Sequence, residues 1–399
     1  MIFYSIVKIG LKKFFRTPTG IKIVGSLLLS LTVAALQLLP SLELYLSSTR
    51  TIYSPQELFK FLLPMDQLIT YLAPDFFGNP ATRNLILVKG GSYYEGVLFI
   101  GIAALILAFF ALVAQNKNKI VRFYALATLI GLFFSFDFLF AKLQLLLPIP
   151  FLSTTIPNRI LFVPTFCLSI LTAFGLDYYL KKSDRRLTKL IILLALVYLI
   201  IITNLLIIIG FHLPYFKQET SLAIISLRNL VIPIVIFTVT SFLLLSGNQV
   251  KTLKSFGVKI IICASLINIF LFSQKYFSFV ERKFIFPPTQ IFTFINQNQG
   301  YHRSLSMTAD KLLNNIPLQY RIYYPEGYDP ASIESYAQFV SLMRGTQVGP
   351  RVRSVAELGS LDPEKFLGRG QNLKLLNLLG IKYLFSEKVN SAIFEKYQF

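Results

Sequence analysis

Three carboxylates stand at the ends of long apolar segments, where a charged side chain is costly. Glu43 follows the first of these segments, Glu95 opens the second, and Asp137 lies in the last turn of the third. Ionisable groups at membrane depth normally face a cavity, a partner or a substrate path. A carboxylate in such a place can act as a general base toward an acceptor hydroxyl. These residues therefore indicate chemistry near one surface of a membrane.

Two arginines are expected at the same height as these acids. Arg50 comes after the first apolar segment and Arg159 immediately before the fourth. A guanidinium can pair with a carboxylate, and it can also neutralise the phosphate of a lipid-linked donor. A set of interhelical ion pairs without chemistry would use the same residues. Both interpretations remain open from the residues alone.

The apolar segments themselves predict a polytopic α-helical membrane protein. About 20 apolar residues cross the hydrocarbon core of a bilayer. Seven segments are long enough by this measure, and they cover 22–42, 93–114, 121–140, 160–180, 189–211, 227–246 and 257–273. Only 15% of the 399 residues are charged, compared with roughly 25% in soluble domains. A water-soluble enzyme is therefore excluded.

Basic residues concentrate in alternate connections between these segments. Sixteen Lys and Arg lie in short stretches on one side, and eight lie in the mostly longer connections on the other. The positive-inside rule places the first side in the cytoplasm. This predicts a cytoplasmic segment 1–21, a seven-span membrane domain 22–273 with a large outer loop 43–92, and an extracytoplasmic domain 274–399. Anchoring next to anionic lipid accounts for these sixteen of the 39 Lys and Arg, which argues against nucleic acid as a partner despite the net charge of +20.

The outer location restricts the cosubstrates. Nucleotide sugars and ATP are absent outside the cell, which favours donors linked to polyprenyl phosphate, because their headgroup already lies at the interface. No cofactor is predicted with certainty. His212 and His302 are far apart in the sequence and form no zinc-type motif. Binding of a divalent metal by other residues remains open.

The predicted outer domain has the pattern of a mixed α/β fold. One helix is expected over 331–344, closed by Gly345, and another over 363–379 with an interruption near Gly368. The β-branched and aromatic residues of 381–386 predict a strand. About 125 residues can bury a core of their own.

Six short motifs in one order resemble the YfhO family of bacterial membrane proteins. The most distinctive is Leu72-Ala-Pro-Asp-Phe-Phe-Gly-Asn-Pro80. The six fall at 37–50, 72–80, 93–101, 157–177, 327–330 and 375–383, and the resemblance covers about residues 30–385. That family is similar to the GT-C glycosyltransferases, which are multispanning enzymes. They take a sugar from a polyprenyl phosphate on the outer face, and a GT-C-like membrane fold is expected here.

The resemblance implies a set of site residues and partners. The expected catalytic residues are Glu43, Glu95 and Asp75. The expected substrate-binding residues are Arg50, Asn79, Tyr94, Asp137, Asn158 and Arg159. The donor would be a polyprenyl-phosphate-linked sugar and the acceptor a cell-envelope polymer such as teichoic acid, in the bacterial cell membrane.

The chain departs from the family pattern at its N-terminal end. Relatives have several spans before the stretch that matches 37–50, so an incomplete fragment is expected, with a partner chain supplying the missing spans. Two functions without chemistry remain as alternatives. One is a transporter of lipid or polysaccharide, and the other is an envelope-assembly protein whose outer domain binds polymer.

Overall fold

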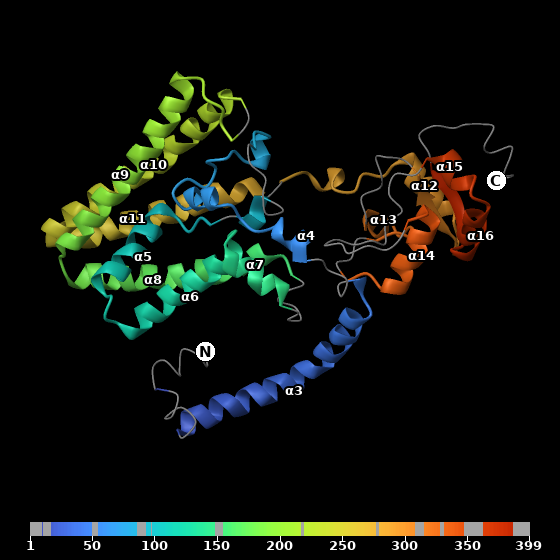
Figure 1. The fold of residues 1–399 in the computed structure, drawn as a ribbon, viewed down its shortest axis with the longest axis horizontal. Helices are drawn as coiled ribbons and strands as arrows, with labels where there is room; N and C mark the ends of the chain where they lie inside the picture. Colours follow the sequence, from blue (N-terminus) through green and yellow to red (C-terminus); the bar gives the residue numbers. More distant parts are fainter. Residues whose placement is uncertain are drawn as a thin grey trace. The chain divides into compact units, whose positions relative to one another are not determined.

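The computed structural model describes most of the chain and divides it into two compact units (Figure 1). The described residues are 10, 17–49, 55–85, 93–96, 98–147, 155–216, 219–276, 279–307, 315–327, 331–346 and 362–385. The first unit comprises Met1–Ser30 and Leu58–Ser278, and the second comprises Leu31–Glu57 and Phe279–Phe399. Helix α3 (Pro18–Leu46) is therefore shared between them along its length.

Five helices in the described part of the chain are long and apolar enough to cross a membrane. They are α3, the stretch Pro157–Lys181 formed by η5 (Pro157–Leu161) and α8 (Phe162–Lys181), α9 (Arg185–Gly210), α10 (Ser221–Gln249) and α11 (Lys251–Ser273). All five coincide with predicted spans. The chain is therefore a helical membrane protein, as the hydropathy pattern predicts.

The predicted span 93–114 differs from the structure. Residues 93–96 form the short helix η4 (Tyr93–Gly96), residues 98–100 are not helical, and α5 covers only Ile102–Ala114. The break falls at Gly101, whose φ of 95° is a left-handed conformation that glycine adopts readily. Thirteen helical residues extend about 20 Å at 1.5 Å each, less than the roughly 30 Å of a hydrocarbon core.

The predicted span 121–140 is also interrupted. Helix α6 (Lys119–Ser135) ends where Phe136 takes up an extended conformation, and α7 (Leu139–Leu146) follows. The interruption is tertiary, because Leu63 accepts a hydrogen bond from the Asp137 N–H and donates its own N–H to the Ser135 carbonyl, both at 2.9 Å. A bridge between distant segments therefore replaces the last turns of the expected helix.

Helix α5 is the centre of the first unit. It contacts α6, α8, α9, α10 and α11, and most of its side chains are buried. Its closest neighbour is α8, where a Cβ on Gly175 would lie 1.9 Å from the carbonyl oxygen of Leu107. Thr172 also donates to the Ala104 carbonyl at 2.9 Å. Small residues of this kind let two helices approach closely inside a membrane.

Three basic turns of the first unit meet at one end of the bundle. Arg186, at the start of α9, donates to the carbonyl of Val113 at the end of α5 (3.0 Å). Asn248, at the end of α10, accepts a hydrogen bond from the Asp184 N–H at 3.1 Å. The buried Lys254 of α11 reaches the carbonyl of Lys182 at 3.4 Å. These contacts join the turns α5–α6, α8–α9 and α10–α11, which the sidedness analysis assigns to one side.

The second unit contains a small parallel sheet. Strand β1 (Arg303–Ser306) pairs with β2 (Ile381–Phe385), and Leu305 lies opposite Leu384. The helices of this unit are α12 (Gln290–Asn298), α13 (Ile316–Gln319), α14 (Glu334–Arg344), α15 (Pro363–Leu367) and α16 (Gly370–Leu378). The buried cluster of Leu305, Val340, Met343, Phe366 and Leu376 lies between them.

The helices of this unit lie close to the positions that the sequence predicts. Helix α14 ends at Arg344, before Gly345 with its φ of 71°, and the predicted 363–379 helix is divided into α15 and α16. Helix α14 begins three residues later than predicted. Residues 332–334 instead pair with 47–49 through the Thr49 N–H to Ser332 carbonyl bond and the Glu334 N–H to Ser47 carbonyl bond, both 2.9 Å.

Candidate functional site

The segment that follows α4 (Pro55–Phe59) enters the helix bundle and is fixed there by three side chains. Tyr198 of α9 donates to the Leu72 carbonyl at 2.9 Å, and Ser226 of α10 donates to the Phe76 carbonyl at 2.7 Å. Asn229 donates to the Asp75 carbonyl at 2.6 Å. Ser226 and Asn229 lie in the first turns of α10, whereas the basic turn lies at its other end. The segment is therefore held at the end opposite the basic turns.

Within this segment, Gly78 allows a tight fold of the chain. Its φ is 79°, and a Cβ there would lie 2.0 Å from the carbonyl oxygen of Asn84. The buried Asn79 accepts from the Thr82 N–H at 3.0 Å and so caps the short helix η3 (Pro80–Thr82). Asn84 in turn accepts from the Asn79 N–H at 3.1 Å. The loop is thus held closed by its own amides.

A pocket of about 460 Å³ opens between this loop and helices α5, α10 and α11. We call it the Asp75 pocket, and its lining residues are Pro74, Asp75, Asn79, Thr82, Phe99, Ile102, Arg228, Asn229, Ile232, Pro233, Asn268, Leu271, Phe272, Gln274 and Lys275. The volume lies in the range of small-molecule sites, which is roughly 300–1,000 Å³. Polar and charged groups line the pocket, and Phe99, Ile102 and Leu271 contribute hydrocarbon surface.

Asp75 is the only carboxylate that lines this pocket in the described part of the chain, and it has two partners there. Lys275 of η6 (Gln274–Tyr276) forms an ion pair with its Oδ2, and Tyr93 donates to its Oδ1 at 2.8 Å. The Asp75 side chain is 14% exposed and that of Lys275 is 35% exposed. The pair is therefore partly open to the pocket.

Three further groups give the pocket binding capacity. Arg228 is exposed and forms no ion pair with any described carboxylate. Pro233 has no backbone N–H. The carbonyl of residue 229 in α10 therefore lacks the hydrogen bond that it would normally accept within the helix. The Oδ1 atom of Asn268 is buried without a hydrogen-bond partner among the described residues. The pocket thus offers a cation for a phosphate and acceptors for hydroxyl groups, beside one carboxylate.

Two predicted site residues pair outside this pocket. Arg159 binds Glu95 through Nε and Nη2, both at 2.8 Å from the same carboxylate oxygen, and so forms an ion pair of the kind that the sequence left open. The Arg159 guanidinium also borders a smaller pocket of about 210 Å³. Asp137 instead pairs with Lys142, five residues along the chain.

The structure brings only some of the remaining candidates together. Asp75 and Asn79 share the Asp75 pocket, as their common motif predicts. Asn158 is fully buried, which favours a role in packing over contact with substrate. Glu43 lies in α3, within the second unit, so its proximity to Glu95 stays a prediction. Arg50 and the Tyr94 side chain lie outside the described residues.

The sequence reasoning missed four polar residues of the Asp75 pocket, which are Arg228, Asn229, Asn268 and Lys275. Lys275 is 200 residues from Asp75, and no local pattern links the two. For Lys275, the only hint in the sequence was its position. It follows the last apolar segment, on the side of the membrane where few basic residues were expected. Asn229 lies within a predicted span, where an amide usually has a partner.

No metal centre is visible in the part of the chain that the structure describes. Within those residues, no group of three or more His, Cys, Asp or Glu side chains lies close enough to hold an ion. The Asp75 pocket itself brings together a carboxylate, cations and amides.

Comparisons with known proteins add no assignment. A scan against protein-family models, a search of curated proteins and a search of solved structures each found no match. The functional argument consequently rests on the Asp75 pocket and on the residues that form it.

Proposed function

We propose that this protein is a membrane glycosyltransferase that uses a polyprenyl-phosphate-linked sugar, and that the Asp75 pocket holds the donor headgroup. The single observation that supports this most strongly is the composition of the pocket. One carboxylate, two cations, Arg228 and Lys275, and several apolar side chains line the same pocket. An amphiphile with a phosphate head and an apolar chain matches that arrangement.

The proposed reaction uses each charged group once. Asp75 accepts the proton of an acceptor hydroxyl, and the hydroxyl oxygen forms a bond to the anomeric carbon of the sugar. The bond between that carbon and the phosphate oxygen breaks, and its electron pair leaves with the polyprenyl phosphate. Arg228 and Lys275 stabilise the charge that develops on the phosphate. Lys275 releases Asp75 when it turns to the phosphate, so donor binding frees the base.

The position of the pocket supports a donor from the outer leaflet. It lies at the end of the bundle opposite the three basic turns, and the positive-inside rule assigns those turns to the cytoplasm. Nucleotide-linked donors are absent on the outer side, whereas lipid-linked donors are held there by their chains. The acceptor in this proposal is a hydroxyl-bearing cell-envelope polymer.

Transfer of a radiolabelled sugar from polyprenyl phosphate to envelope material tests this function. Membranes containing the chain should transfer label above empty membranes, and Asp75→Asn should lower the rate by about 100-fold or more, the usual effect of removing a general base. Asp177→Asn is the matched control, because Asp177 also pairs with a lysine, Lys181, and lies outside the Asp75 pocket. Equal rates for Asp75→Asn and the unaltered chain would contradict the proposal.

A second function, lipid handling without chemistry, is favoured by one specific observation. Asp75 already has Lys275 and Tyr93 as partners, as a carboxylate in a purely structural ion pair would. Under this alternative, the chain binds polyprenyl phosphate but no donor gives transfer. Glu95→Gln and Arg159→Ala variants belong in the same assay, since a loss of transfer confined to them would move the reaction to the Glu95–Arg159 pair.

A further inference from the structure

A second pocket of about 460 Å³ lies on the other side of the segment that carries Asp75. We call it the Asp66 groove. Its lining residues are Met65, Asp66, Leu68, Ile69, Leu72, Phe76, Phe77, Val197, Ile200, Ile201, Asn204, Leu205, Tyr215 and Phe216. The first seven come from η2 (Met65–Tyr71) and the residues after it, and the others from α9 and the connection that follows. Pro74 and Asp75 line the Asp75 pocket, whereas Phe76 and Phe77 line this groove.

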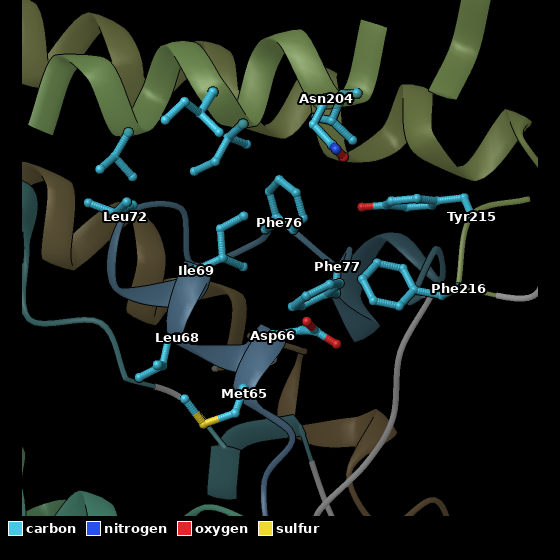
Figure 2. Close-up of a pocket in the computed structure, with 14 residues that line it drawn as sticks. Met65, Asp66, Leu68, Ile69, Leu72, Phe76, Phe77, Asn204, Tyr215 and Phe216 are labelled. Atoms are coloured by element: carbon cyan, nitrogen blue, oxygen red, sulfur yellow. The ribbon is translucent and has the colours of Figure 1, made fainter. Parts of the chain in front are cut away.

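One part of the groove is built for a hydrocarbon chain. Val197, Ile200, Ile201 and Asn204 lie along α9 over about 10 Å, at 1.5 Å per residue. Ile200 is 66% exposed, and Ile69 and Leu72 lie across the groove from this helix (Figure 2). Aliphatic side chains on both walls give an acyl chain continuous apolar contact.

The other part of the groove carries a single charge. Asp66 is the only charged side chain among the described lining residues, in a protein whose net charge is +20. It is exposed, and its carboxylate forms no hydrogen bond or ion pair with any described residue. Figure 2 shows that carboxylate directed toward Phe77, on the same side of the groove as Phe216. An unneutralised carboxylate beside an apolar channel attracts a cation and repels an anion.

Aromatic residues surround this charge. The ring centroids of Phe77 and Phe216 are 5.4 Å apart, and those of Tyr215 and Phe216 are 4.7 Å apart. The Tyr215 hydroxyl is already engaged with Ser226 at 2.7 Å. Burial raises the pKa of Tyr215 to about 12, with the Asp66 charge as a further contribution, so the phenol stays neutral and adds no second negative charge. Carboxylates and aromatic rings together are typical of sites for organic ammonium groups.

We propose that the Asp66 groove binds a lipid whose headgroup carries a primary ammonium, with the ammonium at Asp66 and one hydrocarbon chain along α9. The two neighbouring pockets then recognise different groups, a phosphate at the Asp75 pocket and an ammonium at the Asp66 groove. The Asp75 pocket carries two cations and one carboxylate, and the Asp66 groove carries a carboxylate alone. This inference does not depend on sugar transfer, because it concerns a separate pocket.

Native mass spectrometry of the full chain, delipidated in detergent, tests the proposal without any donor sugar. The probes are phosphatidylethanolamine, which carries a primary ammonium, and phosphatidylglycerol, which does not. We expect the ethanolamine lipid to bind at least about fivefold more tightly, and Asp66→Asn to abolish that preference. Asp177→Asn is the matched control, since Asp177 is an exposed carboxylate outside the groove, and it should keep the preference.

A second pair of variants tests the chain-binding part of the groove. Ile200→Trp fills it and should lower the binding of the ethanolamine lipid severalfold. Leu199→Trp is the control, because Leu199 is 57% exposed on the same helix and does not line the groove. Equal effects of these two substitutions would overturn the placement of the chain along α9.

Two results would overturn the ammonium site itself. One is an unchanged lipid preference in Asp66→Asn, provided that its thermal unfolding matches that of the unaltered chain. The other concerns Lys217, which lies outside the described residues but directly follows Phe216 in the sequence. Binding that occurs only in Lys217→Ala would mean that the protein's own ammonium group occupies the site.

Discussion

At the scale of single residues, the account depends on the pairing of Asp75 with Lys275. The pair joins positions 200 residues apart, and both side chains line the same pocket. The motif around Asp75 made this carboxylate a candidate from the sequence, whereas its cation could not be predicted, because long-range pairing depends on how α11 ends beside the loop. Glu95 and Arg159 are the opposite case, since both residues were candidates and the structure pairs them.

Removing the Lys275 charge should weaken donor binding. Charge-assisted hydrogen bonds contribute about 1.5–3 kcal/mol, and 1.4 kcal/mol corresponds to a tenfold change in affinity. We therefore expect Lys275→Gln to raise the Kd for polyprenyl phosphate by about tenfold or more, measured by thermophoresis in detergent. Lys283→Gln is the control, since Lys283 pairs with Glu281 on an exposed surface outside the pocket. An unchanged Kd in Lys275→Gln would exclude this lysine from the site.

Asp184 gives a pH-dependent prediction. It caps α9 by accepting from the Arg186 N–H at 2.9 Å, and hydrogen bonds from Arg186 lower the pKa of its carboxyl below the ordinary value. Stabilisation by this charge is therefore complete above about pH 4, the ordinary pKa of Asp, and is lost as the pH falls through the lowered value. Asn also caps helices, so Asp184→Asn removes the charge and keeps the cap.

The melting temperature in detergent, measured as a function of pH, checks this. At pH 7 the variant should be less stable by up to about 1 kcal/mol, because the partner Arg186 is 43% exposed and the pair is partly screened. The two proteins should converge as the pH falls through the lowered pKa of Asp184, because its carboxyl is then protonated. A constant difference across the whole range would mean that the charge is not responsible.

At the scale of secondary-structure elements, the close approach of α5 and α8 organises the membrane unit. A Cβ on Gly175 would lie 1.9 Å from the Leu107 carbonyl oxygen, whereas a Cβ on Gly257 of α11 meets nothing nearer than 3.6 Å. Alanine in a helix is intrinsically favoured over glycine by about 1 kcal/mol. If alanine destabilises the protein at Gly175 but not at Gly257, the difference is therefore due to packing and not to helix propensity.

Gly175→Ala should destabilise the folded protein by about 1–3 kcal/mol, the usual cost of overpacking, despite the better helix propensity. Gly257→Ala should be neutral or slightly stabilising. Thermal unfolding in detergent, followed with size-exclusion chromatography, measures both. Equal stability of Gly175→Ala and the unaltered chain would show that α5 and α8 are not so close.

Hydropathy predicted most of the elements, and its two errors have a common cause. It located α3, α8, α9, α10 and α11, because each is a continuous apolar helix of sufficient length. It extended the other two apolar helices too far. In both cases the helix is interrupted although the sequence stays apolar. One interruption is at Gly101, which has a left-handed conformation, and the other is at the bridge from Leu63 to the residues around Phe136. Periodicity cannot register contacts of that kind.

For the whole molecule, the proposed function requires the end of the bundle that carries the Asp75 pocket to face outward. The three basic turns meet at one end of the first unit, and the segment with Asp75 enters from the other. The positive-inside rule assigns these ends to the cytoplasm and the exterior respectively. Composition predicted this separation of charge, and the packed turns agree with it.

Cysteine accessibility in whole cells tests the orientation. In a variant with Cys167 and Cys263 replaced by Ala, the added substitution Lys117→Cys should resist a membrane-impermeant maleimide until the cells are opened. Arg83→Cys should react in intact cells, because it lies in the loop near the Asp75 pocket. Each position serves as the control for the other. Labelling of Lys117→Cys in intact cells would reverse the topology.

The most direct test of the central claim is a cryo-electron-microscopy map of this chain in a lipid nanodisc with a non-hydrolysable polyprenyl-phosphate sugar analogue. The account predicts phosphate density in the Asp75 pocket within hydrogen-bond distance of Arg228 and Lys275, with the sugar beside Asp75. Headgroup density beside Arg159 and Glu95, with the Asp75–Lys275 pair still closed, would contradict it.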